Sequence, residues 1–514
     1  MIELILIICL VLCLLKMATS NIAACTAVYV GKKASANGHA YYGRTEDVNA
    51  STKRFVIYEH ATHNEGEFYE DSRGDNFKMP MPKETLRFSA LEDSKLHGEG
   101  EYPYGEAGFN ELGVSVSATV TTFAGEAAAK ADPSVKGGIN EVVLGHVLLG
   151  KATSARHGIE YLGQIMKEYG ASEQFLIFIA DEEEIWVFEA VSGHQWAAMK
   201  LPEDKVSVIP NHIIMGKVDV NDHENYMVSE DLVKLAKDNG FLVEEDGMIN
   251  VMKTYSDPFG TYDSYRAYAG RKFFNPELDV NETDNYYEML FDSAKKITLQ
   301  DIKNLLSIRY EDKPYSYNNG IDENNFNIRP IGVLRQAEVH VFELDDKIST
   351  QWQCMGPIEF STFVPFYTRI MSETPKNMQY YDIVPVQGQY DWMFRKLSTL
   401  CSLNREMYGK NVRTYWDNYQ LALIKANEEV VAKMNELYLE DPKAAETKAN
   451  TLAAAIAKEA SERAVLITNE LLYYMTAEET NTLRAYALKE KMQPFMPSCL
   501  EKGIYTAYNF DMEI

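Results

Sequence analysis

The feature that most constrains this sequence is a series of four short apolar segments between residues 175 and 210. Each segment is rich in β-branched or aromatic residues, and turn-forming residues separate it from the next, which is typical of strands. Connections this short join antiparallel neighbours, so the series predicts an antiparallel meander. The four segments are Phe175–Ala180, Glu184–Ala190, Gln195–Lys200 and Val206–Pro210.

Other parts of the chain predict both strands and helices. Helical spacing appears near residues 140–149 and 153–169. Helices combined with antiparallel strands indicate an α+β fold. Residues 215–330 are rich in Asn, Asp, Gly and Tyr, and we expect them to be irregular and to contribute lids or binding loops. The further predicted strands are 26–30, 39–44, 54–58, 113–120, 340–344 and 351–354.

The segment from about 411 to 492 has a different character. It is rich in Ala, Glu and Lys, with apolar residues three and four apart, which predicts two or three amphipathic helices. Asp441-Pro442 interrupts the pattern. We therefore expect these helices to pack on the sheet region as part of its core, and a coiled-coil interface is the less favoured alternative.

Composition excludes several classes of partner. The chain has 514 residues with 46% hydrophobic residues, enough for a large core. Fifty Lys and Arg against 76 Asp and Glu give a net charge of -26. Such a charge repels phosphate backbones and anionic lipid, so we expect no nucleic-acid partner.

The N-terminus predicts export. Ile2–Leu15 is an apolar run too short to span a bilayer comfortably but suited to a signal peptide, and Ala23-Ala24 is a small-residue cleavage site. Cleavage there would remove residues 1–24 and release the chain to the periplasm or the extracellular space. The first residues, Met-Ile-Glu, lack the usual Lys or Arg, which leaves a retained anchor open. We expect no stable membrane span after this segment.

Removal of residues 1–24 would leave Cys25, Cys354, Cys401 and Cys499. These are too few for a disulfide scaffold, and a single bridge among the last three stays open beside buried thiols. Cys25 has three alternative fates. It is a catalytic nucleophile, a lipid-modified residue of a lipobox-like Ile22–Cys25 sequence, or a structural cysteine.

Common catalytic motifs are missing from the sequence, namely G-x-S-x-G, G-x-x-x-x-G-K-[ST], H-E-x-x-H and paired C-x-x-C. The ten histidines have no metal-ligand spacing. Cleavage before Cys25, however, would place a thiol and a free α-amine on one residue. An α-amine has a pKa of about 7.7–8.0, so at neutral pH it can accept the thiol proton without a catalytic histidine.

The opening residues resemble the secreted dipeptidase family related to secernins, which are cysteine N-terminal nucleophile hydrolases. The resemblance begins with Cys25–Ser35 and Tyr42–Asp47. It covers about residues 25–400, and its order of short motifs makes the combination specific. The later motifs are 110–119, 186–196, 208–212, 352–357 and 364–367. More distantly, the opening is similar to penicillin V acylases and bile salt hydrolases.

The resemblance implies a four-layer αββα sandwich over residues 25–400, followed by a helical extension over 401–514 that packs on it. It also implies catalytic roles for several side chains. Cys25 would be the nucleophile, Arg44 would favour its thiolate, and Asp47 would orient the amine. Asn211 would bind the oxyanion, and Arg266 would be the second arginine of the acylase pattern, although Arg271 lies close enough to leave the register open.

The residues themselves leave other interpretations. Arg44 and Asp47 would suit a surface ion pair, and Asn211 after Pro210 would suit a turn. Thr119 lies where the acylases carry another Asn, and we expect it to contact substrate. This departure favours short peptides with a free amine as substrates, bound by acidic residues for which Asp47, Glu46 and Glu141 are candidates.

The expected enzyme is thus an exported cysteine dipeptidase that acts through an acyl-enzyme and requires no metal or organic cofactor. The alternatives are an N-acyl amide hydrolase of the penicillin or bile-salt type, and a surface lipoprotein that binds peptides or glycans without catalysis. The sequence leaves open whether the chain forms a homo-oligomer.

Overall fold

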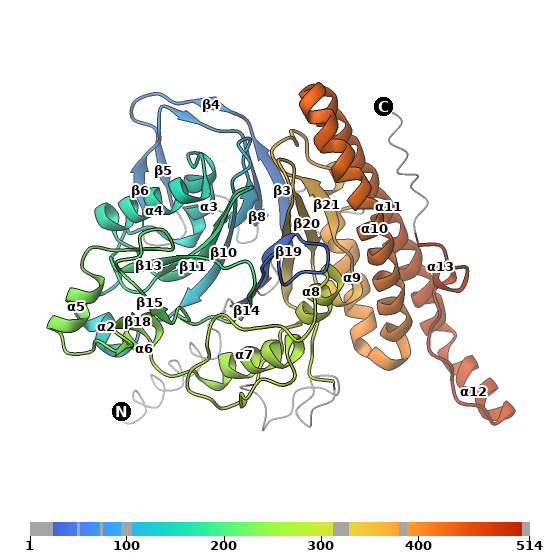
Figure 1. Cartoon of the computed structure of the whole chain (residues 1–514). Helices are drawn as coiled ribbons and strands as arrows, with labels where there is room; N and C mark the ends of the chain where they lie inside the picture. Colours follow the sequence, from blue (N-terminus) through green and yellow to red (C-terminus); the bar gives the residue numbers. More distant parts are fainter. Residues whose placement is uncertain are drawn as a thin grey trace, which may run out of the picture.

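The computed structural model describes residues 24–48, 52–71, 76–93, 105–311, 328–379 and 388–505. The expected signal peptide, apart from Ala24, lies outside these residues. Two six-stranded antiparallel sheets form the centre of the molecule, and helices lie on both sides of them (Figure 1). The α+β class expected from the sequence is confirmed.

The first sheet, here sheet I, has the strand order β14-β1-β2-β19-β20-β21. Strands β1 (Ala24–Val30) and β2 (Ala40–Asp47) form the N-terminal hairpin that the sequence predicts. From Tyr41 to Asp47 every residue of β2 is buried, so both faces of the sheet are covered at this point. The other strands are β14 (Val206–Ile209), β19 (Gln336–Leu344), β20 (Thr350–Met355) and β21 (Val364–Tyr367).

The second sheet, sheet II, has the order β16-β13-β12-β11-β10-β9. Three consecutive strands of the predicted meander, β11, β12 and β13, pair with one another as expected. The strands of this sheet are β9 (Ala107–Phe109), β10 (Ser115–Thr122), β11 (Gln174–Ala180), β12 (Ile185–Ala190), β13 (Trp196–Lys200) and β16 (Tyr226–Val228).

The fourth strand of the predicted meander is placed differently, and that prediction is wrong. β14 leaves sheet II and pairs with β1, with Val208 opposite Val28, while β16 occupies the free edge of β13. All four residues of β14 are buried, so the strand gains a covered position in sheet I. Because Ile209 pairs with Ala27, the residues that follow β14 come to lie beside the start of β1.

The two sheets pack face to face, with β10 against β1 and β2. The inner faces meet through polar contacts as well as apolar ones, since Tyr42 Oη donates to Ser115 Oγ (2.6 Å). On the outer side of sheet II lie α3 (Glu141–Leu149) and α4 (Ala155–Tyr169). On the other side of the molecule, α9 (Tyr390–Leu403) packs on β20.

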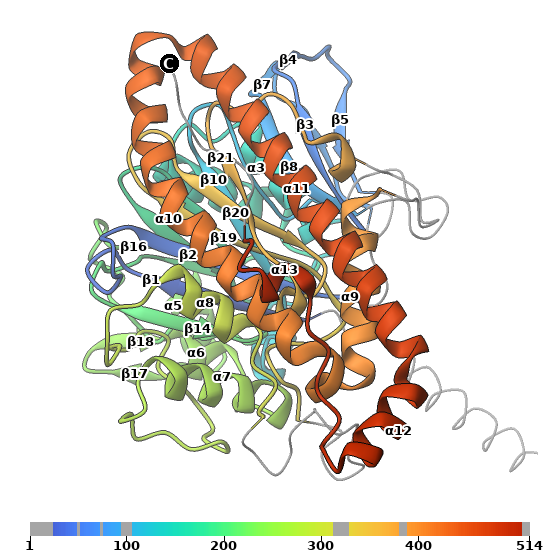
Figure 2. The ribbon, with the colours of Figure 1, turned by 90° about the vertical axis from the view of Figure 1, so that its right-hand side faces the viewer.

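Three helices follow one another near the C-terminus. α10 (Lys410–Glu440) and α11 (Pro442–Thr476) run side by side along the molecule, and α12 (Glu478–Leu488) continues beyond them (Figure 2). The break at Asp441-Pro442 is confirmed, because the Asp441 carboxylate accepts the Lys443 and Ala444 N–H groups and begins α11.

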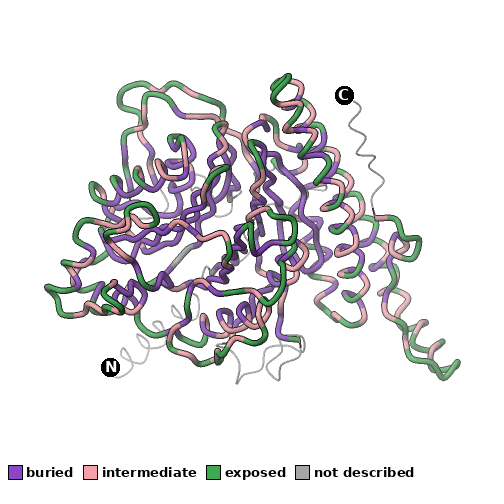
Figure 3. The backbone as a smooth tube through the Cα atoms, in the orientation of Figure 1, coloured by how far each residue is buried: buried purple, intermediate pink, exposed green. Residues whose placement is uncertain are grey.

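The buried faces of α10 and α11 belong to the same hydrophobic core as sheet I, so the expectation of core packing is confirmed. Figure 3 shows this distribution, with buried residues concentrated in the sheets and exposed residues on the outer faces of the helices. The boundary expected at residue 400 falls inside α9. None of the helices in the described part of the chain is both long and apolar enough to span a bilayer.

The region expected to be irregular, residues 215–330, contains ordered helices, among them α7 (Thr261–Phe274) and α8 (Leu299–Leu306). α7 was missed because it has no simple apolar stripe. Its buried side includes two arginines, Arg266 and Arg271, and it packs against β14. A helix that buries charged side chains does not show the apolar periodicity used to predict helices.

Candidate active site

Cys25 is the second residue of β1, on the inner face of sheet I. In the β1–β2 hairpin Cys25 lies opposite Glu46, and Ala27 lies opposite Arg44. Residues two apart on a strand share a face, so Arg44 and Glu46 both point toward the space between the sheets. The Cys25 side chain is buried, and Arg44 Nη1 donates to its Sγ atom (3.2 Å). A guanidinium in this position favours the thiolate, the reactive form of cysteine.

The backbone of Cys25 is held by two of the other predicted residues. Its N–H donates to Asn211 Oδ1 (3.0 Å), and its carbonyl accepts from Arg266 Nη1. In this chain Cys25 is joined to Ala24, so that nitrogen is an amide. Removal of residues through Ala24 would turn the same nitrogen into an α-amine beside Asn211.

The orientation of the Asn211 amide follows from its partners. Arg266 Nη2 lies 2.9 Å from Asn211 Oδ1, and a guanidinium only donates, so the atom facing it is the oxygen. The Nδ2 group is then the other, donating end of the amide. This is the group that the predicted oxyanion role requires.

The loop that carries Asn211 is anchored at two points. The Asn211 N–H donates to Asp263 Oδ1 (3.2 Å). Further along, Glu189 of β12 accepts the N–H groups of Ile214 and Met215, one on each carboxylate oxygen (2.9 and 3.0 Å). Burial raises the pKa of Glu189 to about 7. Glu189 therefore connects sheet II to the loop that follows β14.

Arg266, and not Arg271, is the arginine that reaches Cys25. Arg266 is fully buried, and besides Cys25 and Asn211 it binds Asp263 Oδ1 (2.5 Å). Burial lowers its pKa, and the nearby Arg329 charge adds to this effect. Arg271 is equally buried but binds backbone carbonyl groups, such as those of Val208 (3.2 Å) and Ala267 (3.0 Å). Of the two arginines that the sequence left open, these contacts bring Arg266 to Cys25.

Asp47 lies at the end of β2, opposite Ala24, and is buried. It accepts from Thr45 Oγ1 (3.0 Å) and forms an ion pair with Arg329. Thr45 Oγ1 in turn accepts the Thr26 N–H (3.1 Å), which links Asp47 to the start of β1. Both Asp47 and Arg44 are buried with other partners, so the alternative of a surface ion pair between them is wrong.

Thr119 lies on β10 and is buried. Two residues earlier on the same strand, Ser117 Oγ contacts His340 Nε2 of sheet I (2.8 Å), so Thr119 also faces sheet I. Thr119 Oγ1 has no hydrogen-bond partner among the residues that the structure describes. The structure thus places the predicted substrate contact between the sheets with an unsatisfied hydroxyl.

Several site residues were missed by the sequence interpretation. Glu106 forms an ion pair with Arg44, and Arg329 pairs with Asp47. Asp263 precedes Arg266 by three residues on α7, a helical spacing that would have indicated the pair if the helix had been predicted. No local pattern indicates Glu106 or Arg329.

The remaining thiols and pockets lie away from this cluster. Cys354, Cys401 and Cys499 are each buried and free, without a disulfide. Burial raises the pKa of Cys354 to about 12, so this thiol is protonated and unreactive. In the described parts of the chain no three His, Cys, Asp or Glu side chains gather as metal ligands.

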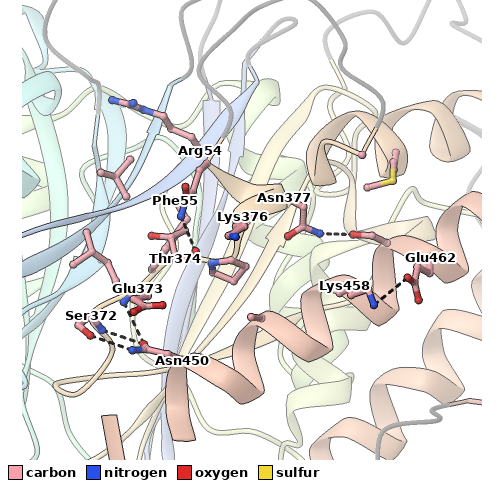
Figure 4. Close-up of a pocket in the computed structure, with 18 of the residues that line it drawn as sticks. Arg54, Phe55, Ser372, Glu373, Thr374, Lys376, Asn377, Asn450, Lys458 and Glu462 are labelled. Carbon is pink, nitrogen blue, oxygen red and sulfur yellow. Dashed lines mark hydrogen bonds and ion pairs between the residues drawn. The ribbon is translucent and has the colours of Figure 1, made fainter. Parts of the chain in front are cut away.

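A pocket of about 1100 Å³ lies between β3 (Lys53–Tyr58), α11 and residues 372–379, and none of its lining residues belongs to the Cys25 cluster (Figure 4). Asn450 Oδ1 accepts the N–H groups of Ser372 and Glu373 (3.1 and 3.2 Å), and Asn377 donates to Ser461 Oγ (2.7 Å). These side chains bind residues 372–377 to α11.

Comparisons with known proteins identify a family and relatives of the chain. The family model described as peptidase family C69 matches residues 24–418. The chain is 31% identical over 471 residues to a probable dipeptidase B of Streptococcus pyogenes serotype M3, covering 87% of this chain and 93% of that protein. It is 35% identical over 364 residues to a probable dipeptidase of Salmonella dublin, covering 68% of this chain and 81% of that protein.

Among solved structures, a mutant conjugated bile acid hydrolase from Clostridium perfringens aligns with 11% identity and a TM-score of 0.30, covering 64% of this chain and 88% of that one. That likeness is too weak to assign a fold. The match over residues 24–418 begins one residue before the cysteine around which Arg44, Asn211 and Arg266 gather. The chain belongs to peptidase family C69.

Proposed function

We propose that this protein is an exported dipeptidase that hydrolyses short peptides with Cys25 as its N-terminal nucleophile. The observation that carries the proposal is the pair of contacts at one residue. Arg44 Nη1 lies 3.2 Å from the Cys25 thiol, and Asn211 Oδ1 lies 3.0 Å from the Cys25 nitrogen. The family membership supports a peptidase, and the names of the relatives support dipeptides as its substrates.

The proposed reaction begins once the residues before Cys25 have been removed. The free α-amine takes the proton from the Cys25 thiol, and Sγ attacks the carbonyl carbon of the peptide bond. The resulting oxyanion accepts a hydrogen bond from Asn211 Nδ2, an electrostatic stabilisation that is typically worth about 10²–10³ in kcat per donor. The C–N bond then breaks, and the leaving amine takes the proton that the α-ammonium held.

A thioester between Cys25 and the first part of the substrate remains. Water attacks its carbonyl carbon with the α-amine as general base, the C–S bond breaks, and the thiol recovers its proton. In this scheme Arg44 favours the thiolate of Cys25. Asp47, which lies opposite the start of β1, orients the α-amine. No step requires a metal or an organic cofactor.

The architecture of this proposal is a four-layer αββα sandwich of the N-terminal nucleophile hydrolase type over residues 25–400, with residues 401–514 as a helical extension. The face-to-face sheets and the helices on their outer sides support it. The apolar run Ile2–Leu15 and the small residues before Cys25 support export to the periplasm or the extracellular space.

A direct assay tests the function. Purified protein is incubated with dipeptides, N-acetyl dipeptides, penicillin V and a conjugated bile acid, and the products are separated by chromatography. We expect hydrolysis of dipeptides and none by Cys25→Ala. Preferential hydrolysis of penicillin V or the bile acid would instead support the N-acyl amide hydrolase, and no hydrolysis together with partitioning into detergent would support the lipoprotein.

A further inference from the structure

The space between the sheets beside Cys25 holds more carboxylates than cations. Arg44 Nη2 contacts Glu106 and lies 3.4 Å from Glu46 and 3.5 Å from Glu338. Among the described residues this cluster has four carboxylates and two permanently charged cations. The carboxylates are Glu46, Asp93, Glu106 and Glu338, and the cations are Arg44 and Lys53.

The two cations of this cluster are divided among its four carboxylates. His340 Nδ1 lies 3.0 Å from Glu338. Lys53 is shared between Glu46 (2.6 Å) and Asp93 (2.7 Å). Burial raises the pKa of Glu46 despite its two cationic neighbours. Buried charge without a counter-ion is costly, so this region is suited to receive a cation.

Within this cluster, Glu106 has a carboxylate oxygen that forms neither a hydrogen bond nor an ion pair with the residues that the structure describes. Its side chain is buried, and one oxygen, Oε2, pairs with Arg44. The other oxygen, Oε1, has no hydrogen-bond partner among the described residues. Buried polar atoms are nearly always hydrogen-bonded, and an exception in a folded protein requires an explanation such as a ligand.

The position of Glu106 relative to the nucleophile fits the shape of a peptide. The two terminal nitrogens of the Arg44 guanidinium hold the Cys25 thiol and the Glu106 carboxylate, respectively. In a peptide substrate the α-ammonium nitrogen is separated from the attacked carbonyl carbon by two bonds of about 1.5 Å each. A substrate whose α-ammonium lies beside Glu106 therefore has its first carbonyl carbon near Cys25 Sγ.

A second unsatisfied oxygen lies on the neighbouring strand. The Ala118 N–H donates to the Glu106 carbonyl (2.9 Å), and Thr119 is the next residue of β10. Thr119 Oγ1 is buried, faces sheet I and also lacks a partner in the described part of the chain. An ammonium has three N–H donors, so it can bond to both a carboxylate and a hydroxyl.

We propose that Glu106 binds the α-ammonium of the substrate's first residue, with Thr119 Oγ1 as a second acceptor, so that the enzyme selects peptides with a free amine. This inference rests on the proposed dipeptidase function and adds the residue that selects the substrate. Of the carboxylates considered from the sequence, Glu46 belongs to the same cluster but is paired with Lys53, and Asp47 is paired with Arg329.

The test compares a dipeptide with its N-acetyl form in the processed wild-type enzyme and in Glu106→Gln. Gln keeps the shape of the side chain but removes its charge. A hydrogen bond to a charged group is worth enough to predict a loss of roughly 10–100-fold in kcat/KM for the dipeptide. We expect less than about a threefold change for the N-acetyl dipeptide. The ratio of the two rates does not depend on the folded fraction of the variant.

The same comparison can be made without turnover by measuring reversible inhibition by an amino aldehyde and by its N-acetyl form, because both aldehydes add to the Cys25 thiol.

Glu343→Gln is a matched control. Glu343 is a buried carboxylate at the other end of β19, where it binds Tyr41 Oη (2.9 Å) and Trp352 Nε1 (2.7 Å). We expect Glu343→Gln to leave the ratio of the two rates unchanged.

A loss of equal size for both substrates in Glu106→Gln would overturn the proposal, since Glu106 would then act only by positioning Arg44. In that case the alkylation rate of Cys25 by iodoacetamide would fall as well. Wild-type enzyme that cleaves neither substrate would contradict the dipeptidase function itself, and this outcome is distinct from the previous one.

Discussion

The two buried arginines of α7 offer a direct test of how the site is held together. Arg266→Met removes the side chain that links the Cys25 carbonyl to Asn211. It leaves Asn211 Oδ1 without its second donor and leaves the Asp263 carboxylate without its cation. Removing one partner of a buried ion pair typically costs about 3–5 kcal/mol. Global stability of about 5–15 kcal/mol tolerates such a loss in most cases.

The effect of Arg266→Met on catalysis should come in addition to its effect on stability. Without Arg266 the Asn211 amide loses one of the contacts that orient it, so its Nδ2 group is held less firmly toward the oxyanion. Losing an oxyanion donor predicts a fall of about 10²–10³ in kcat. Dipeptide turnover is measured on the folded fraction, which a urea titration determines for each variant.

Arg271→Met provides the control, because Arg271 is equally buried on the same helix. Its hydrogen bonds in the described part of the chain go to the backbone carbonyl groups of Val208, Ala267 and Glu288. We expect it to lower the free energy of unfolding by a similar amount but to change kcat by less than about threefold. Equal losses of kcat in the two variants, or wild-type kcat in Arg266→Met, would refute the reasoning.

Three further predictions concern other parts of the molecule. Burial raises the pKa of Glu189 to about 7, so the folded protein loses roughly 3 kcal/mol of stability from this residue as pH rises from about 4.5 to 7. Glu189→Gln should remove this contribution to the pH dependence of the free energy of unfolding, measured by urea titrations across that pH range. Cys354→Ala should keep full dipeptide turnover. In the native wild type the Cys354 thiol is buried and protonated, so mass spectrometry should find it unlabelled by iodoacetamide. Gly43→Ala should destabilise the protein by at least about 1–3 kcal/mol, because its Cβ would lie 2.0 Å from the His340 carbonyl oxygen; a melting temperature equal to that of the wild type would contradict this packing.

The parts of the site that are close in sequence could be predicted. Cys25 and Arg44 lie on adjacent strands of one hairpin, so a short turn between two strand patterns brings them together. The resemblance to a known family added Asn211 and Arg266, which come from β14 and α7. Their contact with Cys25 depends on β14 crossing to sheet I, which the strand pattern alone predicted wrongly.

The residues that could not be predicted are those whose role depends on long-range packing. Glu106 reaches Arg44 from sheet II, and Arg329 reaches Asp47 from a segment 282 residues further along the chain. No local pattern describes such contacts, because they arise only when the two sheets face each other. The helix that carries Arg266 was missed for a related reason, since its buried side is charged and not apolar.

The most direct test of the central claim is the mass of the N-terminal peptide of the active enzyme, isolated from its own host before and after inactivation by iodoacetamide. The account predicts a chain that begins at Cys25 with a free amine, and loss of activity in step with alkylation of that residue. Full activity in a protein that still carries Ala24, or in one whose Cys25 bears a lipid, would contradict it.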